Sequence, residues 1–277
     1  MRALRPIRPP VSIEKEYRDK LLKLIREMDD SLMYWLTAKY RQAESEIVGD
    51  GKLGDLTTEL RKQSEKWKKR FQEESATLST WFATSIRNYV AYNLANQMRK
   101  YKLVKLGFDL KYSYRSQKER MVFRSIVEQN VNLIKSIEEE YLKDVTGVVF
   151  RNIETGHDLA RMRDELHKTY GVTERRAKMI ARDQTNKATN NLSRRRLLDY
   201  GVTKAKWLHT STGKTYRESH LEMDGEIYSI EEGCLDTDYG DYIQPGELVN
   251  CHCTCVPLIG LSKEDDVLAE WKEGESE

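Results

Sequence analysis

The sequence contains no long hydrophobic run. No stretch approaches the roughly 18 consecutive apolar residues that a membrane-spanning helix requires. The first residues, Met1–Pro6, lack the apolar segment of a signal peptide. We therefore expect a protein without a membrane partner that stays in the cytosol with reduced thiols.

Common enzyme signatures are also absent. The sequence has no HExxH zinc-protease motif, no phosphate-binding loop pattern and no dinucleotide-binding glycine pattern. We expect from these absences that the protein is not an enzyme.

Basic side chains are scarce near the C-terminus. Residues 221–277 contain 16 Asp or Glu and 2 Lys or Arg, a net charge of −14, whereas the other 220 residues carry a net charge of +16. A basic region of this kind is suited to phosphate or to an acidic partner, with the acidic end kept away from it. The alternative is that the charges are only solvated helix faces.

Cysteine is missing from the first 233 residues. All four cysteines and three of the five histidines lie between residues 209 and 255. Thiolate and imidazole are the preferred protein ligands of zinc, and a tetrahedral site needs four of them. The crowding predicts a structural zinc site, for which the expected ligands are His220, Cys234, Cys251 and Cys253; the remaining members of the cluster are His209, His252 and Cys255.

Other interpretations of this cluster remain open. In a regular strand, Cys251 and Cys255 face one side and Cys253 the other, so one ion cannot take all three without a turn or bulge. Without a metal, the reduced cysteines would be half-buried and His220 would hydrogen bond to a carboxylate. A disulfide between Cys234 and Cys251 would require an oxidising compartment.

Helical periodicity dominates the first 200 residues. Over residues 12–47 and 56–106, apolar residues recur mostly three or four positions apart. Ser116 and Glu119 form a potential capping box that would open the next helix. The predicted helices span residues 12–47, 56–106, 116–130, 131–155, 157–170 and 173–200, the last three ending at Gly156, Gly171 and Gly201.

Polar residues interrupt the apolar stripe of the last predicted helix, at Asp183, Thr185, Asn186, Asn190 and Asn191. Buried polar groups need hydrogen-bond partners. We expect these side chains to cap loops of the following domain, and binding of a ligand is the alternative.

After Gly201 the hydrophobic period changes to that of strands. An alternating segment is centred on Trp207, and another follows a turn signal at Asp224-Gly225. The predicted strands are 204–209, 226–230 and 250–259, connected in part by an acidic loop over 231–244 and followed by a short helix from Gly260.

Several short motifs occur in a fixed order toward the C-terminus. They are an upstream helix over 176–186, Lys206-Trp207, Arg217-x-x-His220, Met223-Asp224-Gly225, Pro245 and Asn250-Cys251-x-Cys253-Thr254. Over about residues 173–260 this series resembles the C-terminal domain of phage minor head proteins, the family typified by the F protein of phage Mu. The resemblance implies a role in head morphogenesis, with Trp207, Arg217, Asp224 and Gly225 as structural motif residues.

The expected fold class is α+β. An elongated, mainly helical N-terminal two-thirds would precede a small C-terminal β-containing domain rich in Cys and His. The expected parts are a basic extended arm at 1–10, a long-helix docking region at 11–172, the Mu F-like domain at 173–260 and an acidic tail at 261–277.

The resemblance implies a minor capsid protein of the phage head, assembled in the host cytoplasm and located near the portal. Its partners would be the portal protein, major capsid or scaffold proteins, and packaged double-stranded DNA, with a part in DNA packaging or ejection. We expect non-specific phosphate contacts at Lys62, Lys66, Lys69 and Arg70. The alternative function is a metal-dependent hydrolase or nuclease in which Glu222, Asp224 or His220 acts as the base.

Overall fold

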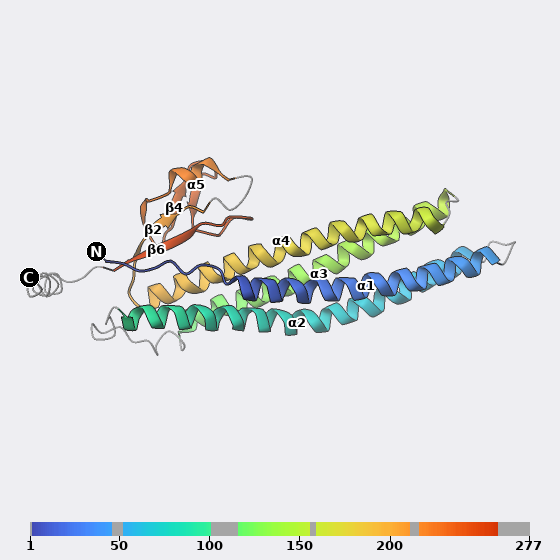
Figure 1. Cartoon of the computed structure of the whole chain (residues 1–277), viewed down its shortest axis with the longest axis horizontal. Helices are drawn as coiled ribbons and strands as arrows, with labels where there is room; N and C mark the ends of the chain where they lie inside the picture. The colour runs from blue at the N-terminus through green and yellow to red at the C-terminus, as the bar shows by residue number, and fades with distance from the viewer. Residues whose placement is uncertain (1, 46–51, 101–115, 156–158, 211–215, 260–277) are drawn as a thin grey trace, which may run out of the picture. The chain divides into compact units, whose positions relative to one another are not determined.

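Four long helices are followed by a small β region in the computed structural model, which describes residues 2–45, 52–100, 116–155, 159–210 and 216–259 (Figure 1). The mainly helical N-terminal region and the small C-terminal sheet that the sequence predicts are thereby confirmed. The expected helix from Gly260 lies outside the described residues. The helices are α1 (Val11–Ser45), α2 (Lys52–Lys100), α3 (Gln117–Glu154) and α4 (Leu159–Asp199).

Buried apolar side chains follow the helical repeat that the sequence predicts. In α1, Tyr17, Leu21, Met28 and Leu32 are buried, three or four residues apart or at a multiple of that spacing. The side chains on the other faces of the helix are partly or fully exposed. Burial of this stripe against neighbouring helices, rather than intrinsic propensity, is what holds so long a helix together.

Two predicted helix breaks are wrong. α3 continues through Asn130, which is buried and donates a hydrogen bond to the carbonyl of Ile126 at 2.8 Å. α4 continues through Gly171, where the nearest atom to an added Cβ would be the Arg175 guanidinium at 3.6 Å. A helical Gly costs only about 1 kcal/mol relative to Ala, which the apolar stripes on either side of it outweigh.

The predicted end of α4 at Gly201 is confirmed. Gly201 has φ of +77°, a left-handed conformation that residues with a Cβ rarely adopt. Its N–H donates to the Leu198 carbonyl at 3.0 Å, and the N–H of Val202 donates to the Leu197 carbonyl at 2.9 Å. This Schellman pattern satisfies the last carbonyls of the helix. Gly156 lies outside the described residues.

The chain divides into two compact units. The first comprises Met1–Pro10, Ser85–Arg124 and Thr185–Glu277, and the second comprises Val11–Thr84 and Ser125–Gln184. The division into arm, docking region, Mu F-like domain and tail stays a prediction.

The core of the second unit contains a polar network beside stacked rings. Tyr17 and Phe82 stack with ring centroids 4.2 Å apart. The Tyr17 hydroxyl donates to Asn130 Oδ1 at 2.8 Å, and Asn130 Nδ2 donates to Gln184 Oε1 at 3.3 Å. Because each of these buried groups has a partner, the network fixes how α1, α3 and α4 align within this unit.

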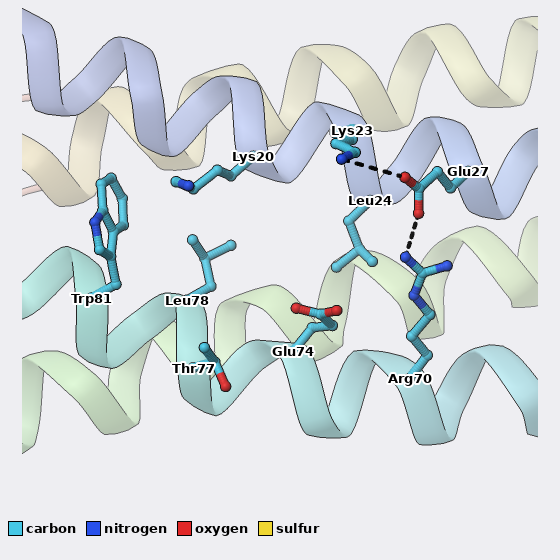
Figure 2. A pocket seen from close by; sticks show the side chains of 9 residues that line it. All are labelled: Lys20, Lys23, Leu24, Glu27, Arg70, Glu74, Thr77, Leu78 and Trp81. Carbon is cyan, nitrogen blue, oxygen red and sulfur yellow. Dashed lines mark hydrogen bonds and ion pairs between the residues drawn. The ribbon is translucent and has the colours of Figure 1, made fainter.

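Within the second unit, a groove of about 370 Å³ lies between α1 and α2. Figure 2 shows Glu27 of α1 between Arg70 of α2 and Lys23 of α1, with both ion pairs drawn. Lys20 lies over the ring of Trp81, 4.9 Å from its centroid. The groove therefore carries charges of both signs, and Arg70 is already paired with a carboxylate.

The C-terminal sheet belongs to the first unit. Its four antiparallel strands have the order β1-β6-β2-β3, and two further strands, β4 and β5, pair separately. The strands are β1 (Arg2–Ala3), β2 (Lys204–Leu208), β3 (Ile227–Ser229), β4 (Cys234–Asp236), β5 (Asp241–Ile243) and β6 (Thr254–Ile259), with a short helix α5 (Glu218–Glu222) between β2 and β3.

Strands predicted near residues 204 and 226 are confirmed, but two other details are wrong. The last strand begins at Thr254 instead of Asn250, and the acidic loop predicted over 231–244 contains the β4–β5 hairpin. The strands β4 and β5 are only three residues long, and the acidic and turn residues around them are typical of a loop. The helix α5 is not among the helices that the sequence predicts.

The N-terminal segment forms a strand that pairs with the C-terminal strand of the sheet. β1 pairs antiparallel with β6, and the N–H of Leu4 donates to the Pro257 carbonyl at 2.8 Å. The side chains of Leu4 and Ile7 are buried. One backbone edge of residues 2–4 is therefore paired with β6, and β1 is the outer strand of the four-stranded sheet.

Candidate metal centre

Three segments of the first unit converge at the candidate metal centre. The helix α5 carries His220, β4 carries Asp236, and the loop before β6 carries Cys251 and Cys253. His220, Cys251 and Cys253 are all buried, and one ligand atom from each lies within 4.8 Å of the others. His220 Nδ1 is 3.4 Å from Cys251 Sγ and 3.7 Å from Cys253 Sγ. This group could hold a metal ion.

Both cysteines can face His220 because they precede the strand. Asn250 has φ of +59°, a left-handed conformation that Asn tolerates better than most residues. The N–H of Cys251 donates to the Leu248 carbonyl at 3.0 Å, which closes a turn. The alternation of a regular strand therefore begins only at Thr254, after the two ligands.

The other predicted ligand lies outside this group. Cys234 is half-buried in β4 and is not among the three residues whose ligand atoms converge. All four cysteines are free thiols, so the possible disulfide between Cys234 and Cys251 is not formed. Cys255 lies in β6, opposite Trp207 of β2.

Two amides of α4 hold the cysteine loop. Asn186 donates to the Cys251 carbonyl, and Asn190 donates to the Cys253 carbonyl at 3.3 Å. The Thr254 hydroxyl donates to Asn190 Oδ1 at 3.1 Å. The expectation that Asn186 and Asn190 cap loops of the following domain is confirmed. These hydrogen bonds set the positions of both thiols, since they fix the backbone on which the thiols are carried.

A buried carboxylate orients His220. Asp236 Oδ2 is 3.2 Å from His220 Nε2. The other oxygen of Asp236 accepts hydrogen bonds from the backbone N–H groups of Asp238 and Tyr239, at 3.0 and 3.2 Å. A proton on Nε2 would be donated to Asp236, and the lone pair of Nδ1 would then face the two sulfur atoms. Metal-bound histidines commonly have such a carboxylate partner.

Electrostatics of the group favour anionic sulfur next to imidazole. The pKa of the Cys251 thiol is lowered, mainly because Cys253 hydrogen bonds to it, and the pKa of Cys253 is raised in turn. Burial lowers the pKa of His220, but the Cys251 sulfur and the Asp236 carboxylate outweigh burial, so the pKa is raised. Burial raises the pKa of Asp236, but its hydrogen bonds outweigh that effect and the pKa is lowered. The hydrogen bond from Cys253 thus favours the anionic form of the Cys251 sulfur beside the imidazole.

The predicted structural motif residues surround the centre. Trp207 is fully buried, with its ring centroid 5.5 Å from that of His220. Asp224 accepts a hydrogen bond from the N–H of His209 at 2.8 Å, and Gly225, at φ of +90°, donates to the Trp207 carbonyl at 3.0 Å. Arg217 donates to the Val249 carbonyl at 3.2 Å.

Two residues that the structure places at this group, Asp236 and His209, are not among the ligands that the sequence predicts. Asp236 was one of several acidic residues in a predicted loop, and nothing in the sequence distinguishes it from its neighbours. His209 belongs to the cluster of cysteines and histidines in the sequence but is not one of the four expected ligands. Its Nδ1 is 3.5 Å from Cys253 Sγ. A cavity of about 270 Å³ adjoins the centre. The residues that line it include His209, His220, Cys251, Cys253, Arg217 and His252.

The predicted phosphate-binding residues lie in α2, in the second unit. Lys62, Lys66 and Lys69 are exposed, and their spacing places them on one face of the helix. Arg70 is half-buried and paired with Glu27.

Comparison with known proteins finds similarity over much of the chain. Residues 143–256 match a family model described as Phage Mu protein F like protein. An uncharacterized protein of Haemophilus influenzae is 29% identical over 275 residues, which cover 95% of this chain and 57% of that protein. The chain thus spans little more than half the length of this relative. No solved structure matches the chain. Among the described helices, none is long and apolar enough to cross a membrane.

Proposed function

We propose that this protein is a minor capsid protein that acts in head assembly near the portal, because residues 143–256 match the family model described as Phage Mu protein F like protein, a family of phage head morphogenesis proteins. The family domain is the observation that carries the proposal. The site is compatible with it, because a buried group of thiols and imidazole is suited to stabilising a small sheet.

Docking on the portal or on capsid and scaffold proteins is assigned to the helical second unit. Its helix α1 exposes neighbouring aromatic side chains, Tyr34 and Trp35, whose exposed fractions are 66% and 36%. The two rings meet edge to face with centroids 5.2 Å apart. Exposed aromatic residues are enriched at protein interfaces.

The location can be tested in assembled heads. Particles from cells that express this protein together with the phage head proteins would be purified by density banding and analysed by quantitative mass spectrometry. We expect the protein to band with the heads at a fixed ratio to the portal protein. A Tyr34→Ser, Trp35→Ser double variant would band less, and the surface substitutions Lys118→Gln and Arg124→Gln are the control. Recovery of the unaltered protein only outside the particles would contradict the proposal.

Packaged DNA would be met by the basic face of α2. Lys62, Lys66 and Lys69 are exposed at a spacing that keeps them on one side, so they can meet one phosphate strand together. Arg70 contributes less, since Glu27 already neutralises its charge. Contacts of this kind do not depend on base sequence and weaken steeply with salt.

We expect replacement of Lys62, Lys66 and Lys69 by Gln to weaken binding to random duplex DNA and to reduce the slope of log K against log salt concentration by about 3. Fluorescence anisotropy at several salt concentrations measures that slope. The control replaces three exposed basic residues of α3, Lys118, Arg120 and Arg124, and removes the same charge. Equal slopes for the two triple variants would refute the assignment to α2.

A structural zinc ion is the cofactor that best fits the site. Thiolate and imidazole are its usual ligands in closed structural sites, and Asp236 supplies the carboxylate that orients one imidazole. When bound, zinc would couple folding of the sheet to metal binding.

The alternative function is a metal-dependent hydrolase or nuclease. The adjoining cavity of about 270 Å³ favours it, because substrate could approach the metal group there. Such an enzyme requires an open coordination position for water. The number of protein ligands therefore decides between the two functions.

A further inference from the structure

His209 lies next to the three residues whose ligand atoms converge. Its Nδ1 is 3.5 Å from Cys253 Sγ, and its Nε2 is buried without a hydrogen-bond partner among the described residues. The ring of Tyr216 packs edge to face against it, with centroids 6.0 Å apart. The sulfur of Cys253 is thus the polar contact that this imidazole makes within the described part of the chain.

The distances fit a tetrahedral zinc site. Zn–S bonds of about 2.3 Å and Zn–N bonds of about 2.0–2.1 Å at tetrahedral angles place neighbouring nitrogen and sulfur ligands about 3.6 Å apart. The nitrogen to sulfur distances here are 3.4 and 3.7 Å for His220 and 3.5 Å for His209. Three edges of the tetrahedron are therefore already close to their bound lengths.

We propose that His209, His220, Cys251 and Cys253 form a closed Cys₂His₂ zinc site, in which Asp236 positions the imidazole of His220. This ligand set depends on one part of the proposed function, namely that the domain binds a structural zinc ion. It replaces Cys234 of the sequence-based set by His209.

The ring of His209 moves inward when zinc binds. His209 is not one of the three residues whose ligand atoms all lie within 4.8 Å of one another. It follows the last residue of β2 and is half-buried, so its side chain is less constrained than those of the other ligands. The hydrogen bond from its N–H to Asp224 keeps the backbone next to the centre during this movement.

A closed site has a functional consequence. With four protein ligands, zinc has no position left for an activated water, and the site stabilises the sheet instead of catalysing hydrolysis. His252 lines the same cavity, yet it lies outside the group of converging ligands and stays outside the metal shell.

The zinc affinity of this chain, purified in reduced form, tests the ligand set. It is measured by competition with a chromophoric chelator. We expect one Zn²⁺ per chain, and a loss of roughly 100-fold in affinity for His209→Ala, because one of four ligands is removed. His252→Ala and Cys234→Ser should bind within about twofold of the unaltered chain. Visible absorption of the Co²⁺-loaded chain should show the intense bands of four-coordination, and these should weaken in His209→Ala as water enters.

A rescue variant keeps the test decisive if His209→Ala does not fold. His209→Cys creates a Cys₃His set, which also binds zinc, and its Co²⁺ form should show stronger sulfur-to-metal charge transfer than the unaltered chain. Unchanged affinity in His209→Ala, loss of affinity in Cys234→Ser, or unchanged charge transfer in His209→Cys would each overturn the proposal. Absence of any zinc binding would overturn it too, whereas the association with heads is measured separately and would stand.

Discussion

Replacement of Glu119 by Ala is expected to lower the free energy of unfolding of the first unit by about 3–5 kcal/mol, because it removes a buried carboxylate that forms ion pairs with two arginines. Glu119 is completely buried and accepts hydrogen bonds from Arg87 Nε at 2.8 Å and Nη2 at 3.1 Å, and from Arg196 Nη2 at 3.2 Å. Arg196 is completely buried as well. The three side chains tie α2, α3 and α4 together within that unit.

Urea unfolding followed by circular dichroism measures this change, with the metal content held the same for every variant. Glu128 is an exposed carboxylate of the same helix α3. Its replacement by Ala is the control and should change stability by less than about 0.5 kcal/mol. Similar unfolding curves for the two variants would show that the buried ion pairs do not support the unit.

Replacement of Gly246 by Ala is expected to cost about 2–5 kcal/mol, the sum of backbone strain and overpacking. Gly246 has φ of +79°, where residues with a Cβ are strained. A Cβ at this position would also lie 2.3 Å from Asn190 Nδ2 and 2.9 Å from Asn186 Nδ2. It would push away the two amides that hold the cysteine loop, so zinc affinity should fall together with stability.

Gly240→Ala is the matched control. Gly240 has φ of +77°, but a Cβ there would have no neighbouring heavy atom within 4 Å. This variant should show the backbone cost of about 1–2 kcal/mol alone and should keep its zinc affinity. Fluorescence of Trp207 can report unfolding once the other tryptophans are replaced by Phe. Equal losses in the two variants would mean that contact with the asparagines is unimportant.

The predicted capping box shows which contacts a local sequence pattern can predict and which it cannot. Ser116 does accept a hydrogen bond from the N–H of Glu119, at 3.4 Å, and α3 begins at Gln117 as the pattern requires. The carboxylate of Glu119 binds two arginines that lie far away in the sequence. Those arginines look like solvated helix residues when the sequence is read alone.

The sequence by itself determined the elements whose signals are local. Apolar residues three or four apart placed the helices, Gly201 ended α4, alternation around Trp207 placed β2, and the crowding of cysteines and histidines pointed to the group that could hold a metal ion. Each of these depends on backbone geometry within a few residues. The same local rule failed at Gly171, where packing on both sides of the glycine outweighed its small helix penalty.

Only the tertiary structure decided which of the crowded side chains meet. Cys234 and Asp236 are two residues apart in β4, yet Asp236 contacts His220 whereas Cys234 stays outside the ligand group. Hydrogen bonds from Asn186 and Asn190 to a loop more than 60 residues later bring Cys251 and Cys253 to the same side. A metal centre is defined by distances of a few ångströms in space, and chain folding sets those distances through contacts that spacing along the sequence does not encode.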